Sequence, residues 1–170
     1  MKIAEEPSTE RLAETHLIGK KVRMSFANNR TQELWQDFMP RRAAIENTSS
    51  QGLYSIEVYD NPDFFQHFNP TQEFEKWAAV QVSSFGTAPD GSVPDGMETL
   101  VIPQGLYAVF HYQGKASEAP QAYQYIYGSW IPNSDYELDH RPHFALMGER
   151  YKNNDPSSEE ELWIPIKKRS

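Results

Sequence analysis

The sequence contains no cysteine, which excludes disulfide bonds, thiolate catalysis and cysteine-based metal sites. It has no apolar run near the roughly 20 residues that span a bilayer. Residues 1–10 are charged and lack the apolar core of a signal peptide. Positive charge is also scarce: the chain has 16 lysines and arginines and 24 acidic residues, which gives a net charge of −8. We therefore expect a soluble, cytoplasmic protein that contacts neither membrane nor nucleic acid directly.

Recognisable catalytic motifs are equally scarce. There is no glycine-rich phosphate loop, no Gly-x-Ser-x-Gly nucleophile elbow and no His-Glu-x-x-His zinc motif. His140 and His143 are of a metal-ligating type, but no third ligand stands at motif spacing. The sequence therefore predicts no bound metal and no cofactor, and it leaves open whether the protein is an enzyme.

What the chain does contain is a long apolar stretch at residues 96–114, with one acidic and no basic side chain. Its two apolar pieces, Leu100–Ile102 and Leu106–Phe110, carry the branched and aromatic side chains that favour strands. Between them, Pro103 removes a backbone donor and Gly105 permits a bend or bulge. We expect a bent central strand with which the other elements pair or pack.

Alternation, turn residues and helical spacing predict the remaining elements. Residues 1–13 form an extended lead-in strand or a loose end. Further strands are expected at 17–26, 53–59, 74–82, 143–151 and 161–167, and helices from Thr31 to Pro40 and from Pro120 to Pro132. Pro165 favours an edge position for the last strand, because proline cannot donate to a sheet.

The order strand, helix, strand, strand occurs twice, which predicts an internal duplication. In register with each other, Phe38–Pro40 matches Trp130–Pro132, and the strands 53–59 and 145–151 both end in tyrosine. Two such α+β units bury their sheets against helices and leave a cleft between them. We expect one domain over residues 1–170, with pseudo-repeats at about 14–85 and 97–168 and a connector at 86–96.

Glu149 is the acidic residue singled out as a site candidate. On the expected strand 143–151 it shares a face with Met147 and Tyr151. A carboxylate beside aromatic rings can hold an organic cation, or it can act as an acid of raised pKa. The alternative, a solvated carboxylate beside two basic neighbours, stays open. The three consecutive acids at 159–161 are assigned to the surface.

Five stretches, which are spread over nearly the whole chain after residue 16, carry a family resemblance. They are residues 34–42 (LWQDFMPRR), 53–56 (LYSI), 74–80 (FEKWAAV), 96–110 and 158–166 (SEEELWIPI). In order and spacing they resemble the GyrI-like (gyrase-inhibitor-like) effector-binding domain family, which also occurs attached to AraC-type and MerR-type transcription regulators. The chain looks like a stand-alone member of this family.

The resemblance implies a duplicated split β-α-β fold with a ligand cleft between its halves, and binding of bulky, planar aromatic or cationic compounds. Stand-alone relatives include gyrase-binding proteins, drug sequesterers and hydrolases that open the cyclopropane ring of DNA-alkylating natural products. Ala145 stands where the family commonly has a glutamate, and Gln81 where it often has an acid. In relatives those acids sit in the cleft and hold the ligand's cation or activate water. We expect both positions in the cleft, where the absence of both acids weakens the case for hydrolysis.

Residues and resemblance together predict a module that sequesters or senses an aromatic small molecule. One alternative is a hydrolase that uses Glu149 with Tyr151, and another is an acidic protein that inhibits gyrase. On a regular strand Tyr107 and Phe110 point to opposite faces, so at most one of them can line the cleft. The predicted ligand-binding residues are Tyr54, Trp77, Gln81, Tyr107, Phe110, Trp130, Ala145, Met147, Glu149, Tyr151 and Trp163.

Overall fold

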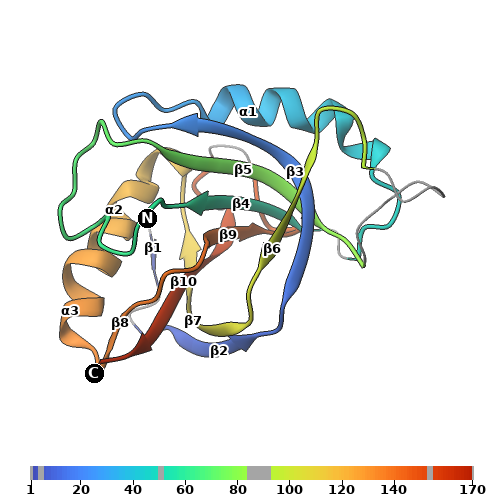
Figure 1. Ribbon diagram of the computed structural model, residues 1–170. Helices are drawn as coiled ribbons and strands as arrows, with labels where there is room; N and C mark the ends of the chain where they lie inside the picture. The colour runs from blue at the N-terminus through green and yellow to red at the C-terminus, as the bar shows by residue number, and fades with distance from the viewer. Residues whose placement is uncertain (1, 4–5, 50–51, 84–92, 153–154, 170) are drawn as a thin grey trace.

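The structure is a computed structural model that describes residues 2–3, 6–49, 52–83, 93–152 and 155–169. Most of the expected connector at 86–96 lies outside the described residues. Strands account for most of the regular structure, and two helical segments accompany them (Figure 1).

The strands follow the expected order, with differences at their ends. They are β1 (Lys2–Ile3), β2 (Ser8–Leu12), β3 (Thr15–Met24), β4 (Leu53–Val58), β5 (Phe74–Gln81), β6 (Glu98–Ile102), β7 (Gly105–Gln113), β8 (Tyr136–Leu138), β9 (His143–Met147) and β10 (Glu159–Lys168). The helical segments are α1 (Thr31–Phe38), the 3-10 turns η1 (Met39–Ala44) and η2 (Ala116–Glu118), α2 (Ala119–Tyr125), the π turn η3 (Ile126–Trp130) and α3 (Ile131–Asn133).

All of these strands belong to one antiparallel sheet in the order β1-β7-β10-β9-β4-β5-β3-β6, with β2 added beside β7 and β8 beside β10. The central pair is β4 and β9, which align Ser55 with Ala145. On one side of this pair lie β5 and β3, and on the other lie β10 and β7. The fold is therefore α+β, with a large antiparallel sheet accompanied by helices.

A bent ribbon joins the two ends of the sheet. Strands β2 and β3 run antiparallel to β7 and β6, and the pairing Leu12–Gly105 continues across the bend as Thr15–Ile102 without a change of register. Because β6 pairs with β3 while β7 pairs with β10, the ribbon bridges both ends of the strand order and the sheet curls round (Figure 1). The expected break around Pro103 is confirmed, since β6 ends and β7 begins there.

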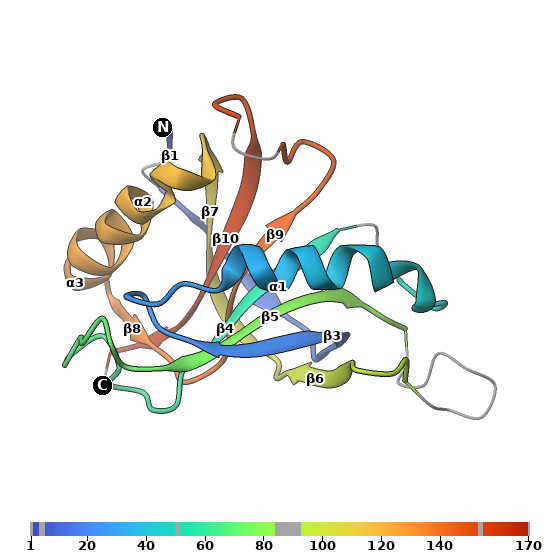
Figure 2. The same cartoon turned by 90° about the horizontal axis from the view of Figure 1, so that it is seen from above.

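The curled sheet has two differently filled faces. We call inner face the one that carries Leu17, Tyr54, Trp77, Tyr107 and Trp163 in one buried cluster. The opposite face, here called the helix face, packs against α1 at the β3–β5 side and against α2 at the β7–β10 side. Figure 2 shows α1 across β3 and β5, with α2 and α3 at the other end of the molecule.

Each helix is placed by a few apolar side chains. Leu34 and Phe38, one turn apart on α1, are buried against β3 and β5. Pro40 ends the α-helix, as expected, and the chain continues as the 3-10 turn η1. Pro120 lies in the first turn of α2, where its missing N–H costs no hydrogen bond. Ile126 opens the π turn η3 and is fully buried.

Gly105 at the ribbon bend leaves room for a buried arginine. The Arg141 guanidinium lies 4.7 Å from the Tyr107 ring centroid and donates from Nη2 to the Leu106 carbonyl at 2.7 Å. A Cβ at position 105 would overlap this guanidinium and lie 2.9 Å from its Nε atom. Glycine at the bend therefore serves close packing as well as chain direction.

Three expectations about the C-terminal part were wrong. The strand expected at 143–151 ends at Met147, and β8 lies in a segment expected to be a loop. Strand β10 is internal, between β7 and β9. Pro165 is tolerated there because β9 pairs only as far as Trp163, while β8 pairs from Ile166 onward, so the proline falls between the two partners.

Candidate ligand-binding site

Four of the predicted ring side chains fill the inner face. Tyr54, Trp77, Tyr107 and Trp163 are all buried and share a cluster with Phe144. The Phe144 and Trp163 rings are stacked at 5.2 Å and 15°, and Tyr107 and Phe144 are 5.5 Å apart. At this spacing the rings occupy the space between them and form a packed core.

Gln81 and Ala145 lie on opposite faces of the sheet, which overturns the expectation that they share one cleft. The Tyr54 hydroxyl donates to Gln81 Oε1 at 3.1 Å on the inner face. Ala145, with Phe110 and Trp130, packs in the helix-face cluster of α2. Along any strand alternate residues change face, and the β4–β9 register places Ala145 beside Ser55 and away from Tyr54.

A cavity of about 290 Å³ opens at one end of the inner face. It is lined by Leu146, His111, the turn Gly148–Arg150 and Glu159–Glu161, so it also borders on Glu160, whose side chain belongs to the helix face. Glu149 is exposed in that turn, so its expected place on a strand beside Met147 and Tyr151 was wrong. Glu159 accepts from His111 at 2.7 Å, and the Trp163 indole donates to Glu161 at 3.2 Å. These two acids already have partners.

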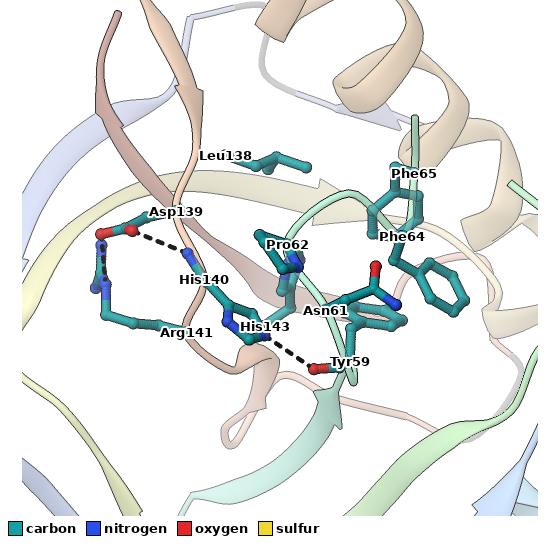
Figure 3. Close-up of a pocket in the computed structure, with 10 residues that line it drawn as sticks. All are labelled: Tyr59, Asn61, Pro62, Phe64, Phe65, Leu138, Asp139, His140, Arg141 and His143. Carbon is teal, nitrogen blue, oxygen red and sulfur yellow. Dashed lines mark hydrogen bonds and ion pairs between the residues drawn. The ribbon is translucent and has the colours of Figure 1, made fainter. Parts of the chain in front are cut away.

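A second cavity, beside the β4–β5 loop, holds about 10 Å³, which is room for roughly one water molecule. Figure 3 shows His140 and His143 on the same side of it as Tyr59, while Arg141 turns away toward Asp139. His140 Nε2 is 3.1 Å from the Tyr59 carbonyl. Among the described residues no group of three or more metal-ligating side chains is gathered, here or elsewhere.

The middle of the helix face has a floor of small side chains. Ala78, Ser55 and Ala145 are neighbours in one cross-strand row over β5, β4 and β9. At one end of the row α1 covers Ala78, and at the other α2 packs against Ala145 and Leu162. Between the helices, therefore, no large side chain rises from the sheet in this row.

Charged groups occupy the cross-strand row next to this floor. Lys76 Nζ and Glu57 Oε2 form an ion pair of 2.8 Å, and their side chains are only 11% and 12% exposed. Glu57 is the cross-strand neighbour of His143. A buried ion pair is costly to form and costly to break, so it marks a polar position inside an otherwise apolar layer.

Glu160 differs from the two acids on either side of it in the chain. It is the cross-strand neighbour of Tyr112 and alternates with Leu162, so it belongs to the helix face. Burial, and secondarily the charge of Glu57, raise the pKa of Glu160 to about 7, although Lys76 acts in the opposite direction. Its carboxylate makes no hydrogen bond or ion pair with the residues that the structure describes. The assignment of Glu160 to the surface was therefore wrong.

Aromatic rings stand above the floor on the α2 side. Phe65 and Tyr127 are stacked at 4.2 Å and 16°, and Tyr127 and Tyr123 at 6.1 Å and 12°. Burial raises the pKa of both tyrosines well above the usual range, with a smaller contribution from Glu57. Glu160 also raises the pKa of Tyr123, so this hydroxyl lies within electrostatic reach of both acids.

His143 is held neutral beneath these rings. Its Nδ1 atom is 2.8 Å from the Tyr127 hydroxyl, and burial lowers its pKa to about 3. Arg141 and His140 contribute in the same direction. The helix face thus combines a small floor, stacked rings, one paired acid and one unpaired acid.

His143 and Glu160 are expected to affect stability in opposite directions between pH 4.5 and 6.5. The lowered pKa of His143 means that its contribution is full above pH 6.5 and is lost as the pH falls toward 3. The raised pKa of Glu160 means that its contribution is full below pH 4.5 and is lost as the pH rises toward 7. In the wild type the two slopes nearly cancel.

Variants that lack one of the two groups should show the pH dependence that the other group causes. In Glu160→Gln the free energy of unfolding rises with pH by roughly 1.4 kcal/mol per unit, and in His143→Asn it falls by a similar amount. Urea denaturation at pH 4.5, 5.5 and 6.5 measures both. Slopes of the same sign in the two variants would contradict the assignment of burial to these groups.

The side chains that define the helix-face site were mostly missed from the sequence. Strand alternation in residues 53–59 already puts Ser55 and Glu57 together, opposite Tyr54, and so contains the signal for two of them. The contribution of Phe65, Tyr123 and Tyr127 depends on contacts between the β4–β5 loop and the second helix, for which the sequence has no local signal. Of the predicted residues, Phe110, Trp130, Ala145 and Met147 lie on or beside this face.

The chain thus combines a curled antiparallel sheet with two helices that pack on one of its faces. Residues 5–167 match the model of the GyrI-like small molecule binding domain, and the chain belongs to this family. No curated protein sequence matches the chain. No helix among the described residues has the length and apolar character needed to cross a membrane.

Solved structures with the same fold have low sequence identity. SAV2435 bound to tetraphenylphosphonium superposes with a TM-score of 0.68 at 17% identity, covering 95% of this chain and 94% of that one. The EcmrR C-terminal domain has a TM-score of 0.66 at 15% identity over 96% and 98%. A hydrolase encoded by lin2189 from Listeria innocua has a TM-score of 0.54 at 11% identity over 95% and 92%. At these identities the likeness establishes the fold.

Proposed function

We propose that this GyrI-like protein binds bulky aromatic cations on its helix face and thereby sequesters or senses them. The observation that carries the proposal is the meeting of stacked rings and desolvated carboxylates over a floor of small side chains. Rings attract organic cations through their quadrupoles, and a carboxylate in a partly dry environment adds charge attraction. A neighbour of the same fold holds tetraphenylphosphonium, a compound of this class.

The loss of the family's usual acid at position 145 does not remove negative charge from this face. Glu57 and Glu160 lie on two other strands of the same face, on either side of the central row. Lys76 neutralises Glu57, so Glu160 is the carboxylate available to a ligand. Ala145 leaves room above the floor that a glutamate would occupy.

Entry of a bulky ligand requires the rings of the second helix to move. That helix is irregular, because a π turn at Ile126–Trp130 interrupts it between two short α-helical pieces. Such π turns are rare and are frequent at functional sites. We propose that this segment shifts to admit the ligand between Tyr123 and the floor.

The strand order also supports a duplicated origin for the site. β3-α1-β4-β5 and β7-α2-β9-β10 have the same element order, and their second strands, β4 and β9, pair at the centre. We propose that these are the two split β-α-β repeats, at about 14–85 and 97–168. The ligand would then bind across their junction, where symmetry brings the two helices to opposite sides of one floor.

Tetraphenylphosphonium titration by calorimetry is the direct test. We expect the wild type to bind it with a Kd on the order of micromolar. Tyr123→Leu keeps apolar area but removes the ring, and it should weaken binding by about tenfold, since one ring contact contributes about 1 kcal/mol or more. The matched control is Leu146→Ala, which alters the inner-face cavity and should change Kd less than twofold.

Two outcomes would oppose the proposal. Absence of binding by the folded wild type contradicts the function itself. If Leu146→Ala weakens binding while Tyr123→Leu does not, the ligand occupies the inner-face cavity and the assignment to the helix face is wrong.

A further inference from the structure

Glu160 is an unpaired carboxylate in a place where unpaired charge is unfavourable. Buried and half-buried acids are normally hydrogen-bonded or ion-paired, because desolvation otherwise costs several kcal/mol. Glu57, on the same face, follows this rule through its 2.8 Å contact with Lys76. Glu159 and Glu161, its neighbours in the chain, follow it on the inner face through His111 and Trp163. Glu160 has no comparable partner in the described part of the chain.

The groups around Glu160 are mostly neutral near pH 7. The charge of Glu160 contributes to raising the pKa of three tyrosines, which therefore remain protonated phenols. They are Tyr112 on β7, Tyr123 on α2 and Tyr151 after β9. From β5 and β4 the charges of Lys76 and Glu57 reach it and oppose each other. Arg150, which lines the same cavity as Glu160, is paired with Glu159 at 3.7 Å. Glu160 therefore has no positive partner of its own, and a proton is the simplest way to remove its charge.

We propose that Glu160 exchanges its proton for the ligand's positive charge, so that an organic cation that binds while this carboxyl group is protonated displaces the proton to solvent. The exchange rests on the proposed function, since it requires a cation on the helix face. It is balanced in charge: a neutral carboxyl group and a cation become an ion pair and a released proton. The site then discriminates against neutral compounds of the same shape, which leave Glu160 protonated.

The expected size follows from proton linkage at a group with a pKa of about 7. Binding of tetraphenylphosphonium should be about tenfold tighter at pH 8 than at pH 6 and should level off above pH 8. At pH 6, calorimetry in two buffers of different ionisation enthalpy should detect release of close to one proton per ligand. Triphenylphosphine oxide, a neutral aromatic probe, should show neither effect.

Variants of two adjacent glutamates, one on each face of the sheet, test which carboxylate releases the proton. Glu160→Gln should abolish both the proton release and the pH dependence, and it should bind at pH 8 about tenfold more weakly than the wild type. Glu161→Gln, one residue away on the inner face, should retain the wild-type behaviour. Glu160→Asp, which keeps a titratable group, should still release a proton, and thermal melts show whether each variant is folded.

The outcomes distinguish the two proposals. If the wild type binds tetraphenylphosphonium with the same Kd at pH 6 and 8 and releases no proton, the exchange is wrong while cation binding stands. Retention of the pH dependence in Glu160→Gln also overturns it. If no binding occurs at any pH from 6 to 8, cation binding and the exchange both fail. Should Glu160→Gln not fold, the two-buffer measurement on the wild type still decides.

Discussion

Replacing Gly19 with alanine is expected to destabilise the protein by about 4 kcal/mol or more, a large part of the roughly 5–15 kcal/mol by which a typical domain is stable. Gly19 lies in the middle of β3, between Ala79 of β5 and Glu98 of β6. A Cβ at this position would overlap the Ala78 carbonyl oxygen and lie 2.7 Å from the Ala79 Cα atom. Because these are backbone atoms, only separation of the strands could relieve the clash.

Separation of β3 from β5 would also distort the candidate site. Ala78, whose carbonyl would be displaced, is part of the helix-face floor and packs against α1. Urea denaturation followed by circular dichroism measures the loss. Gly128→Ala is the matched control, because nothing lies within 4 Å of a Cβ there and alanine is the better helix former by about 1 kcal/mol. A loss below 1 kcal/mol for Gly19→Ala would show that β3 and β5 are not as close as described.

Replacing Lys76 with methionine is expected to cost about 3–5 kcal/mol, because it leaves the carboxylate of Glu57 unpaired in a buried position. The pair is 2.8 Å long, and both side chains are nearly nine-tenths buried, so water screens it little. Methionine conserves most of the volume and flexibility of lysine, so the loss reports the charge. Urea denaturation at pH 7 is the measurement.

A double variant tests whether the loss of stability comes from the unpaired charge of Glu57. Lys76→Met combined with Glu57→Leu removes both charges and should recover most of the lost stability, as buried pairs often do when replaced together. If the single variant loses under 1 kcal/mol, or the double variant is no better, the ion pair is solvated and does not shape the helix face.

Local patterns in the sequence were sufficient for the element order and for most side-chain faces. In the expected strand 74–82, Trp77, Ala79 and Gln81 lie on the inner face and Ala78 and Val80 on the helix face, because period-2 alternation is a local property of any strand. The opposite orientation of Tyr107 and Phe110 is confirmed for the same reason. The break near Pro103 and the ends of the helices follow equally from local backbone chemistry.

The family also followed from the sequence, since residues 5–167 match the GyrI-like model. The family resemblance drew attention to Gln81 and Ala145, and the expected strand face drew attention to Glu149. The structure assigns these three residues to different regions. Gln81 is on the inner face, Ala145 on the helix face, and Glu149 in an exposed turn. Strand alternation says which residues share a face of one strand, but it cannot say which faces of different strands coincide.

The sequence alone established the absence of cysteine, the scarcity of positive charge and the alternation of side chains along each strand. Composition and the repeat of the side-chain pattern can be read from the chain without its fold. Only the tertiary structure decided that Glu160 is desolvated and unpaired while Glu159 and Glu161 are paired. The pairing of β4 with β9 aligns Ser55 with Ala145 across 90 residues of chain, and the β4–β5 loop brings Phe65 onto Tyr127. Burial and charge environment are set by such long-range contacts, so three identical glutamates in a row acquire different chemistry.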